Sequence, residues 1–311
     1  MKHILFTPIY QERVWGGSNF ERKLGRYLPN GKIIGESWEI VDRPEAQSTT
    51  AQGATIRELI AANPEGIMGA GWSADRPFPI LVKWLDCQEK LSLQVHPPAD
   101  IALGLGGEPK TENWYVVDAT ADATLMAGLK NDVTREDFEA GLKNNDLEPL
   151  VHTMHVQAGE SIFIPSGRIH AIGGGNLILE IQQNSDTTYR VYDWGRVGLN
   201  GTPRELHIEE SLKSTDFNDF EPQTLKPSNE AEQILAQSDV FDLRKVQLAA
   251  GETLIFTAGA PRILSIVSGQ LKADDDATLE GGDNALLPAS HALTYTAQSA
   301  AEVPITENFA K

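Results

Sequence analysis

Cysteine is almost absent from this sequence. Cys87 is the single cysteine among 311 residues, which excludes an intramolecular disulfide and favours a reducing compartment; we expect the cytoplasm. Long apolar runs are also missing, since no segment approaches the roughly 20 apolar residues that a helix needs to cross a bilayer. The N-terminal stretch lacks the apolar run and the cleavage site of a signal peptide. We therefore expect no membrane partner.

Positive charge is scarce as well. The chain has 26 Lys and Arg against 44 Asp and Glu, a formal net charge of −18 at pH 7. Such a field repels phosphate, so we expect no nucleic-acid partner. A small phosphorylated substrate remains compatible with this charge if a few Lys and Arg converge locally. Turn-forming residues, in contrast, are plentiful, with 27 Gly and 17 Pro, which favours many short strands over long helices.

The most informative stretch is residues 159–170. An apolar run ends at Pro165, Pro165 and Gly167 mark a tight turn, and a second strand is expected to begin at His170. The spacing G-x5-P-x-G-x2-H resembles the second signature of cupin β-barrels. In that family the turn delivers the histidine into the barrel mouth as a metal ligand. Further nitrogen or oxygen ligands are therefore expected upstream.

Residues 91–96 form one such upstream strand. Period-two alternation puts Ser92, Gln94 and His96 on one face and apolar residues on the other, so Gln94 and His96 can both reach one metal ion. A strand with three polar side chains on one face is either exposed to solvent or lines a polar cavity. The alternation alone leaves both possibilities open.

A second upstream strand follows at residues 110–117. Lys110 and Glu112 share a face by the same alternation. Glu112 supplies the anionic oxygen that zinc sites with histidine ligands often include. Each candidate taken singly is compatible with an ordinary structural role. The combination with His96 and His170 makes a divalent metal site a specific hypothesis.

The chain is predicted to form two β domains joined by a Pro- and Asn-containing connector at residues 217–229. The first, expected to be the catalytic domain, spans residues 1–220. Within it, residues 121–155 change character, and Thr134 followed by acidic residues predicts a helix start, so we expect a small helical insertion there. The second domain spans residues 230–311 and consists of short strands.

A weak echo of the histidine motif occurs at residues 282–291. The G-x5-P spacing is kept, but the turn glycine is missing, one residue fewer precedes His291, and no upstream ligand set accompanies it. We therefore predict that residues 230–311 form a cupin-like β domain without metal. The predicted fold class is mainly β, with two cupin-type β jelly-roll barrels and the small helical insertion in the first.

Six runs of the chain resemble, in the same order, motifs of type I mannose-6-phosphate isomerase in its short bacterial form. They are WGG, GESWE, QVHP, KTENW, PSGRIHA and EIQQNSDTTYRVYD, at residues 15–17, 35–39, 94–97, 110–114, 165–171 and 180–193. The resemblance covers roughly residues 5–215, and the C-terminal part matches only in general character.

This resemblance implies an aldose-ketose isomerase that interconverts mannose 6-phosphate and fructose 6-phosphate through a cis-enediol. It implies one zinc ion per chain, held by His96, Glu112 and His170 with Gln94 as fourth protein ligand. Arg190 falls on the catalytic arginine of the family, and Glu180 falls on a carboxylate near the substrate. The positions associated with the phosphate or the sugar are Lys83, Ser92 and Lys110.

Several alternatives stay open at this level. Glu180 is a candidate base, or a carboxylate that merely orients Arg190 or supports the metal ligands from outside. Arg190 either stabilises the enediolate or holds the phosphate. Arg168 stands where a smaller residue is expected, and its side chain can face inward or outward. Rival functions are a related sugar or sugar-phosphate isomerase on the same scaffold, and a non-catalytic sugar-binding cupin. The oligomeric state is undetermined.

Overall fold

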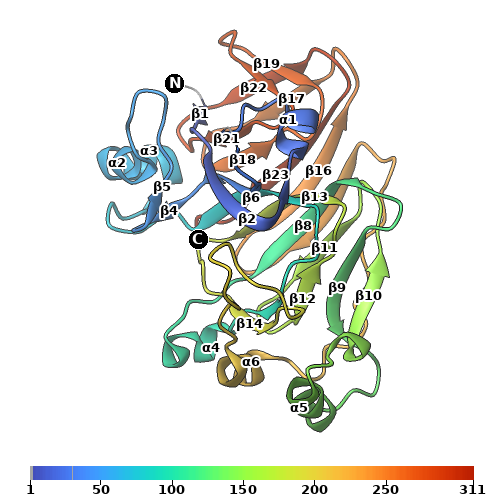
Figure 1. The fold of residues 1–311 in the computed structure, drawn as a ribbon. Coiled ribbons are helices and arrows are strands. Elements are labelled where there is room, and N and C mark those ends of the chain that lie inside the picture. Colours follow the sequence, from blue (N-terminus) through green and yellow to red (C-terminus); the bar gives the residue numbers. More distant parts are fainter. Residues whose placement is uncertain (1–2, 30) are drawn as a thin grey trace.

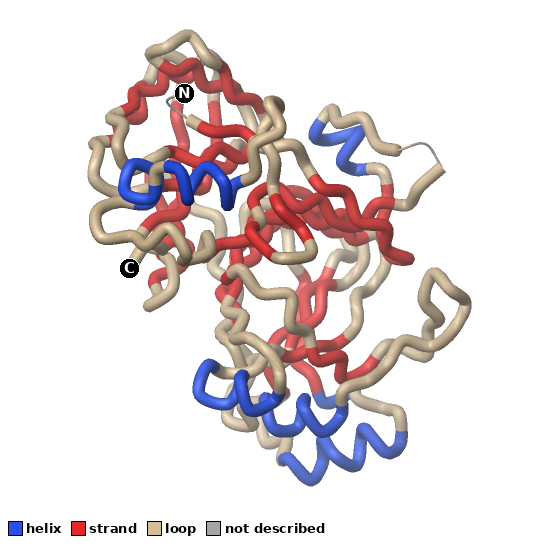
Figure 2. Tube along the Cα trace, turned by 90° about the vertical axis from the view of Figure 1, so that its left-hand side faces the viewer, coloured by secondary structure: helices blue, strands red, loops and turns tan. Residues whose placement is uncertain are grey.

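The computed structural model describes residues 3–29 and 31–311. Its regular structure consists mostly of antiparallel β-sheets, whereas its helices are short and lie at the periphery (Figures 1 and 2). The prediction of a mainly β protein is confirmed. None of the helices formed by the described residues is long and apolar enough to span a bilayer.

Two sheets carry the candidate ligands. Sheet 1 has the strand order β11-β8-β13-β6-β3-β2 and sheet 2 the order β10-β9-β12-β7-β14. The strands of sheet 1 are β2 (Ile9–Gly17), β3 (Ile34–Ile40), β6 (Ile80–Cys87), β8 (Glu112–Ala119), β11 (Ser161–Ile164) and β13 (Asn176–Gln183). Those of sheet 2 are β7 (Leu93–Val95), β9 (Thr124–Leu129), β10 (Val151–His155), β12 (His170–Ile172) and β14 (Tyr189–Tyr192). Buried apolar side chains of both sheets, including Leu85, Val116 and Leu125, form one cluster between them.

Two further sheets are built mainly from the C-terminal residues. Sheet 3 has the order β1-β21-β18-β23-β16-β15 and sheet 4 the order β17-β22-β19-β20. Sheet 3 contains β1 (Ile4–Leu5), β15 (Glu232–Gln237), β16 (Asp242–Leu248), β18 (Arg262–Ser265), β21 (Asn284–Leu287) and β23 (Ala301–Glu307). Sheet 4 contains β17 (Thr253–Phe256), β19 (Gln270–Ala273), β20 (Thr278–Glu280) and β22 (Leu293–Ala297). A second apolar cluster, with Leu271 and Val303, fills the space between these sheets.

Sheets 1 and 3 also pack against each other. Trp84 and Leu179 of sheet 1 belong to the same buried cluster as Leu243 and Ile263 of sheet 3. The layers therefore follow the order sheet 2, sheet 1, sheet 3, sheet 4. Sheet 1 is covered on both faces, which explains why all eight residues of β6 are buried and why its sequence is almost continuously apolar.

The N-terminal strand β1 belongs to the C-terminal sheet, since Ile4 pairs with Leu286 of β21. In Figure 1 this blue strand lies beside the orange and red ones. The division into residues 1–220 and 230–311 stays a prediction, and β1 departs from it because this N-terminal strand belongs to the C-terminal sheet. His291 of the motif echo is exposed and contacts Ser290, so its surroundings differ from the buried surroundings of His170.

The helical insertion is shorter than the expected range of 121–155. Its ends form β9 and β10, which pair antiparallel, and only α5 (Arg135–Asn144) and η2 (Glu148–Leu150) between them are helical. The expectation was wrong at the ends because strand pairing with the remote β12 holds β9 in the sheet. Thr134 caps α5 as predicted, accepting a hydrogen bond from the Asp137 amide.

The remaining helices are brief. Thr55 caps α2 (Ile56–Ala62) through a reciprocal bond with Glu58. The others are α1 (Asn19–Leu24), α3 (Pro64–Met68), α4 (Ala99–Ala102), η1 (Leu103–Leu105) and α6 (Ile208–Ser214), and the short β4 (Asp42–Arg43) and β5 (Ala46–Gln47) form a separate two-stranded sheet. In Figure 1, α4, α5 and α6 lie at the end of the molecule that carries sheet 2.

Candidate metal centre and active cavity

A cavity of about 580 Å³ opens between sheets 1 and 2. Every site residue implied by the family resemblance lines it except two. The lining residues from that set are Lys83, Ser92, Gln94, Lys110, Glu112, Glu180 and Arg190. The two exceptions, His96 and His170, are buried next to Glu112 in the cavity wall. Side chains from five strands and their flanking residues therefore surround one cavity.

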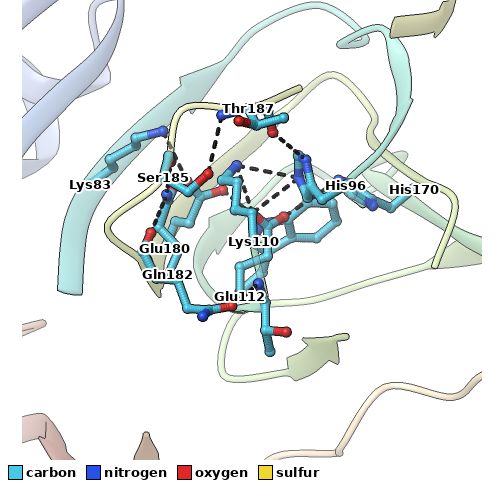
Figure 3. A network of polar contacts seen from close by, with 12 residues as sticks. Lys83, His96, Lys110, Glu112, His170, Glu180, Gln182, Ser185 and Thr187 are labelled. Carbon is cyan, nitrogen blue, oxygen red and sulfur yellow. Dashed lines mark hydrogen bonds and ion pairs between the residues drawn. The ribbon is translucent and has the colours of Figure 1, made fainter. Parts of the chain in front are cut away.

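His96, Glu112 and His170 form a compact buried group (Figure 3). One possible ligand atom from each lies within 4.8 Å of the other two. The Nε2 atoms of His96 and His170 each lie 3.5 Å from a different oxygen of Glu112. His170 Nε2 is buried without a hydrogen bond in the part of the chain that the structure describes, and Glu112 Oε2 is ion-paired with Lys110 Nζ at 2.8 Å. Buried imidazole nitrogens and carboxylate oxygens that converge in this way are suited to holding a metal ion.

Both imidazole rings are oriented by backbone carbonyls. The Nδ1 of His96 lies 2.9 Å from the carbonyl oxygen of Thr187, and that of His170 lies 2.8 Å from the carbonyl oxygen of Arg168. A carbonyl only accepts hydrogen bonds, so a neutral ring carries its proton on Nδ1. The lone pair is then on Nε2, which points toward Glu112. This is the arrangement by which outer partners orient histidine ligands of metals.

The charges of the group also fit a divalent cation. Burial, followed by the neighbouring Lys110 ammonium, lowers the pKa of His96 to about 3, and burial lowers the pKa of His170. Burial opposes ionisation of Glu112, but Lys110 at 2.8 Å and the nearby histidines hold the pKa of this carboxyl well below its usual range. At neutral pH the group therefore offers two neutral imidazoles and one carboxylate, a donor set typical of zinc.

Gln94 lies in the same wall. On β7 it is the cross-strand partner both of His170 on β12 and of Arg190 on β14. Directly opposed residues of neighbouring strands share a face of the sheet, so all three belong to one row. Because Gln94 lines the cavity, the row runs from the candidate metal group to the arginine that the resemblance identifies as catalytic.

A second polar row crosses sheet 1. Trp38, Lys83, Glu180 and Trp114 pair in register on β3, β6, β13 and β8. Trp114 Nε1 donates to Glu180 Oε2 at 2.9 Å, and Lys83 Nζ lies 3.4 Å from Glu180 Oε1. Figure 3 shows Lys83 and Glu180 on the same side of the group as Lys110. Burial and then the Glu112 charge raise the pKa of Glu180, against the opposing pull of Lys110 and Lys83.

Arg190 reaches the cavity from sheet 2. Its Nη1 donates to the carbonyl of Glu205 at 2.8 Å, and its Nε is buried with no hydrogen-bond partner among the described residues. Burial, together with the like charges of Arg204 and Arg196, lowers its pKa, although a guanidinium stays protonated at any physiological pH. The side chain is a cation, and the acceptor of its hydrogen bond, the Glu205 carbonyl, is neutral.

Glu36 was not identified as a site residue from the sequence. It lines the cavity, and its carboxylate accepts hydrogen bonds from Arg13 Nε and from Trp38 Nε1, both at 2.7 Å. Alternation in the GESWE motif puts Glu36 and Trp38 on one face, which is the signal that identified Ser92, Gln94 and His96. The motif contributed only to the family resemblance, and the carboxylate beside the tryptophan was not predicted as a site residue.

The side chain of Arg168 faces away from the candidate metal group. Its Nε and Nη2 donate to the two carboxylate oxygens of Asp219 at 2.8 and 2.7 Å, and its Nη1 donates to the Phe163 carbonyl at 2.7 Å. Arg168 borders a separate surface hollow instead of the active cavity. The alternative of an inward-facing guanidinium beside the metal is therefore excluded.

The fold and the site define the class of protein: a mainly β, cupin-type protein with a candidate metal centre in the wall of a polar cavity. A family model described as phosphomannose isomerase type I, catalytic domain, matches residues 4–140. A probable mannose-6-phosphate isomerase of Bacillus subtilis is 35% identical over 260 residues, covering 80% of this chain and 81% of that relative. A mannose-6-phosphate isomerase of Streptococcus mutans is 34% identical over 289 residues, 89% of each chain.

Solved structures agree with these relatives. The crystal structure of mannose 6-phosphate isomerase from Bacillus subtilis superposes with a TM-score of 0.87 at 28% identity, covering 98% of this chain and 99% of that one. A mannose 6-phosphate isomerase bound with zinc and yttrium shares the fold at a TM-score of 0.76 and 17% identity. The chain belongs to the type I phosphomannose isomerase family. The predicted family, fold class and aldose-ketose isomerase activity are confirmed.

Proposed function

We propose that this chain interconverts mannose 6-phosphate and fructose 6-phosphate at the cavity between sheets 1 and 2, with one zinc ion per chain held by His96, Glu112, His170 and Gln94. The observation that carries this proposal is the buried group of two carbonyl-oriented imidazoles and one carboxylate. When bound, zinc supplies a Lewis acid that stabilises negative charge on sugar oxygens. The zinc–yttrium relative supports the choice of metal.

In this proposal Glu180 carries the proton between C2 and C1 of the sugar. The raised pKa of this carboxyl brings it closer to neutrality, which suits a general base. Trp114 fixes one oxygen, and the other lies beside Lys83 at the cavity. The bonds of Glu180 go to Trp114 and Lys83, whereas Arg190 bonds to Glu205, so the geometry favours the base over a carboxylate that orients Arg190.

The cationic side chains then bind and neutralise the substrate. Arg190 stabilises the negative charge that develops on the enediol oxygens, because a guanidinium remains charged throughout the reaction. Lys83, Ser92 and Lys110 line the same cavity and bind the sugar hydroxyls or the phosphate. Burial between two sheets limits the water that can reach the proton in transit. We also propose a cytoplasmic location, supported by the lone Cys87.

Metal removal tests the proposal. We expect EDTA-treated, dialysed protein to lose turnover of mannose 6-phosphate and to regain it with one equivalent of zinc. Glucose 6-phosphate, assayed in parallel, should be a poor substrate, and a preference for it would favour a related isomerase. Absence of turnover with any divalent metal would refute the enzyme and favour a sugar-binding cupin.

Two variants separate metal binding from catalysis. His170→Ala should lose zinc and activity together, because it removes a ligand. Arg190→Ala should keep its zinc while kcat falls at least 100-fold, the usual cost of removing a charge-stabilising donor. Zinc content by atomic absorption and steady-state kinetics measure both. Near-normal kcat in Arg190→Ala would contradict the role given to this arginine.

A further inference from the structure

The orientation of His170 depends on a turn that a distant part of the chain holds in place. The ring is fixed by the carbonyl of Arg168, two residues earlier. That carbonyl can hold the ring only if residues 165–168 keep their conformation. Inside the turn, the Arg168 amide donates to the carbonyl of Pro165, and the Gly167 amide donates to the remote carbonyl of His96. The Ser166 amide donates to the Thr111 hydroxyl, and the Lys110 amide donates to the Ser166 hydroxyl. Further restraints come from residues after α6.

Residues 216–221, here called the clasp, supply these restraints. The amide of Asp216 donates to the carbonyl of Gly167 at 2.9 Å. Asp219 accepts both parallel hydrogen bonds of the Arg168 guanidinium, and each side chain is only 16% exposed. A bidentate pair of this kind fixes direction as well as distance, because the guanidinium is planar and its two donors are parallel.

The clasp is itself anchored to sheet 2. Leu129 N donates to the carbonyl of Asp219, and Glu221 N donates to the carbonyl of Leu129, both at 2.9 Å. Gly128 makes this approach possible, since a Cβ there would lie 2.5 Å from Pro222 Cδ and 2.9 Å from the Asp219 carbonyl oxygen. Gly128 also has a φ of 70°, a conformation that favours glycine. The amide of Gly128 donates to the carbonyl of Ile169, the residue directly before the candidate ligand His170.

We propose that Asp219, acting through Arg168, is a positioning residue for the metal ligand His170. The clasp belongs to the segment that leads out of the catalytic sheets toward sheet 3, so it couples metal affinity to a connector outside the cavity. The proposal rests on the zinc site proposed above. Partners that orient a histidine ligand typically contribute 10–100-fold to metal affinity. We expect an effect near the lower limit, because Asp219 acts one residue further out.

Zinc affinity of the full-length protein, measured by competition with a chromophoric chelator, tests this proposal. Asp219→Asn keeps the size of the side chain but removes its charge, and we expect zinc binding to weaken about tenfold. Arg168→Lys keeps the charge but loses the parallel fork, so its loss should be smaller. The double variant Arg168→Lys with Asp219→Asn should bind zinc no more weakly than the more affected single variant if the two residues act as one unit.

A matched control separates positioning from general destabilisation. Arg26 and Glu39 form another bidentate, mostly buried pair, at 2.6 and 2.9 Å, but they lie on the other side of sheet 1 against Gly282. Glu39→Gln should lower the melting temperature of the metal-free protein at least as much as Asp219→Asn, yet leave zinc affinity within twofold of wild type. Melting of the metal-free proteins gives this comparison.

The outcomes distinguish the two proposals. Wild-type zinc affinity in Asp219→Asn and in Arg168→Lys would overturn the clasp and leave the metal site untouched. An equal loss of affinity in Glu39→Gln would also overturn it, because the effect would then be general. Failure of the wild-type chain to bind zinc, or zinc binding that survives His170→Ala, would instead overturn the metal site itself.

Discussion

Replacing Glu36 by Gln tests the charge balance of the cavity wall. Glu36 is mostly buried, bonded to Arg13 and Trp38, and close enough to Lys83 for the ammonium to act on it. Burial works to raise the pKa of Glu36, but Lys83, Arg13 and the hydrogen bonds lower it to about 2 from an ordinary 4.5. Gln has the shape of the protonated acid, so the variant reproduces Glu36 without its charge.

The magnitude follows from proton linkage. A carboxyl whose pKa falls from 4.5 to about 2 on folding contributes, at about 1.4 kcal/mol for each pH unit, about 3 kcal/mol to stability. Because the folded pKa is the lower one, this stabilisation is complete above about pH 4.5 and is lost as the pH falls toward 2. The difference between wild type and Glu36→Gln should therefore be about 3 kcal/mol at pH 7. By about pH 3 it should be less than half of that.

Urea unfolding followed by tryptophan fluorescence measures this difference between pH 7 and pH 3, with EDTA present so that zinc release does not contribute. Glu12→Gln is the matched control: Glu12 lies on the same strand as Arg13, and its ion pair with Lys32 is largely exposed, so less than about 1 kcal/mol should be lost. The reasoning would be refuted if the loss of unfolding free energy in Glu36→Gln stayed constant with pH. It would also be refuted if this loss did not exceed the loss in Glu12→Gln.

Three further predictions concern buried side chains and a helix cap. Cys87 is fully buried and burial raises the pKa of its thiol, so iodoacetamide should leave the folded protein unmodified and label it once urea has unfolded it, as mass spectrometry would show. Trp84→Ala removes a fully buried indole between sheets 1 and 3 and should cost about 3–5 kcal/mol in urea unfolding. Thr134→Ala, which removes only the α5 cap, should cost about 1 kcal/mol in the same assay.

Strand alternation was the part of the site that the sequence could predict by itself. It put Gln94 and His96 on one face of their strand, and Lys110 and Glu112 on one face of the next, because successive side chains in a strand must alternate. The same rule applied to the GESWE motif would have identified Glu36. What alternation cannot provide is which faces meet, because that depends on the pairing of β7 with β12 and β14. The resemblance to known isomerases supplied this information.

Long-range pairing explains the other differences between sequence and structure. β1 lies in sheet 3 because it pairs with β21, about 280 positions away, and no local signal specifies that partner. The ends of the helical insertion are strands because β9 pairs with β12. Arg168 was ambiguous for the same reason, since its partner Asp219 is in a connector whose course the local sequence does not determine. The local pattern at Thr134 predicted a helix start correctly, because capping is a local interaction.

The charges in the cavity help to assign the roles of its cations in the proposed reaction. Lys83 lies beside Glu180 and interacts with Glu36, and Lys110 lies 2.8 Å from Glu112, so carboxylates already balance both ammonium groups. Arg190 instead donates to a neutral carbonyl and keeps a buried nitrogen unpaired in the described structure. An anionic substrate or enediolate therefore gains most from Arg190, because pairing with it displaces no carboxylate. Arg190→Ala should thus lower kcat more than Lys83→Ala does, although each variant removes one positive charge from the cavity.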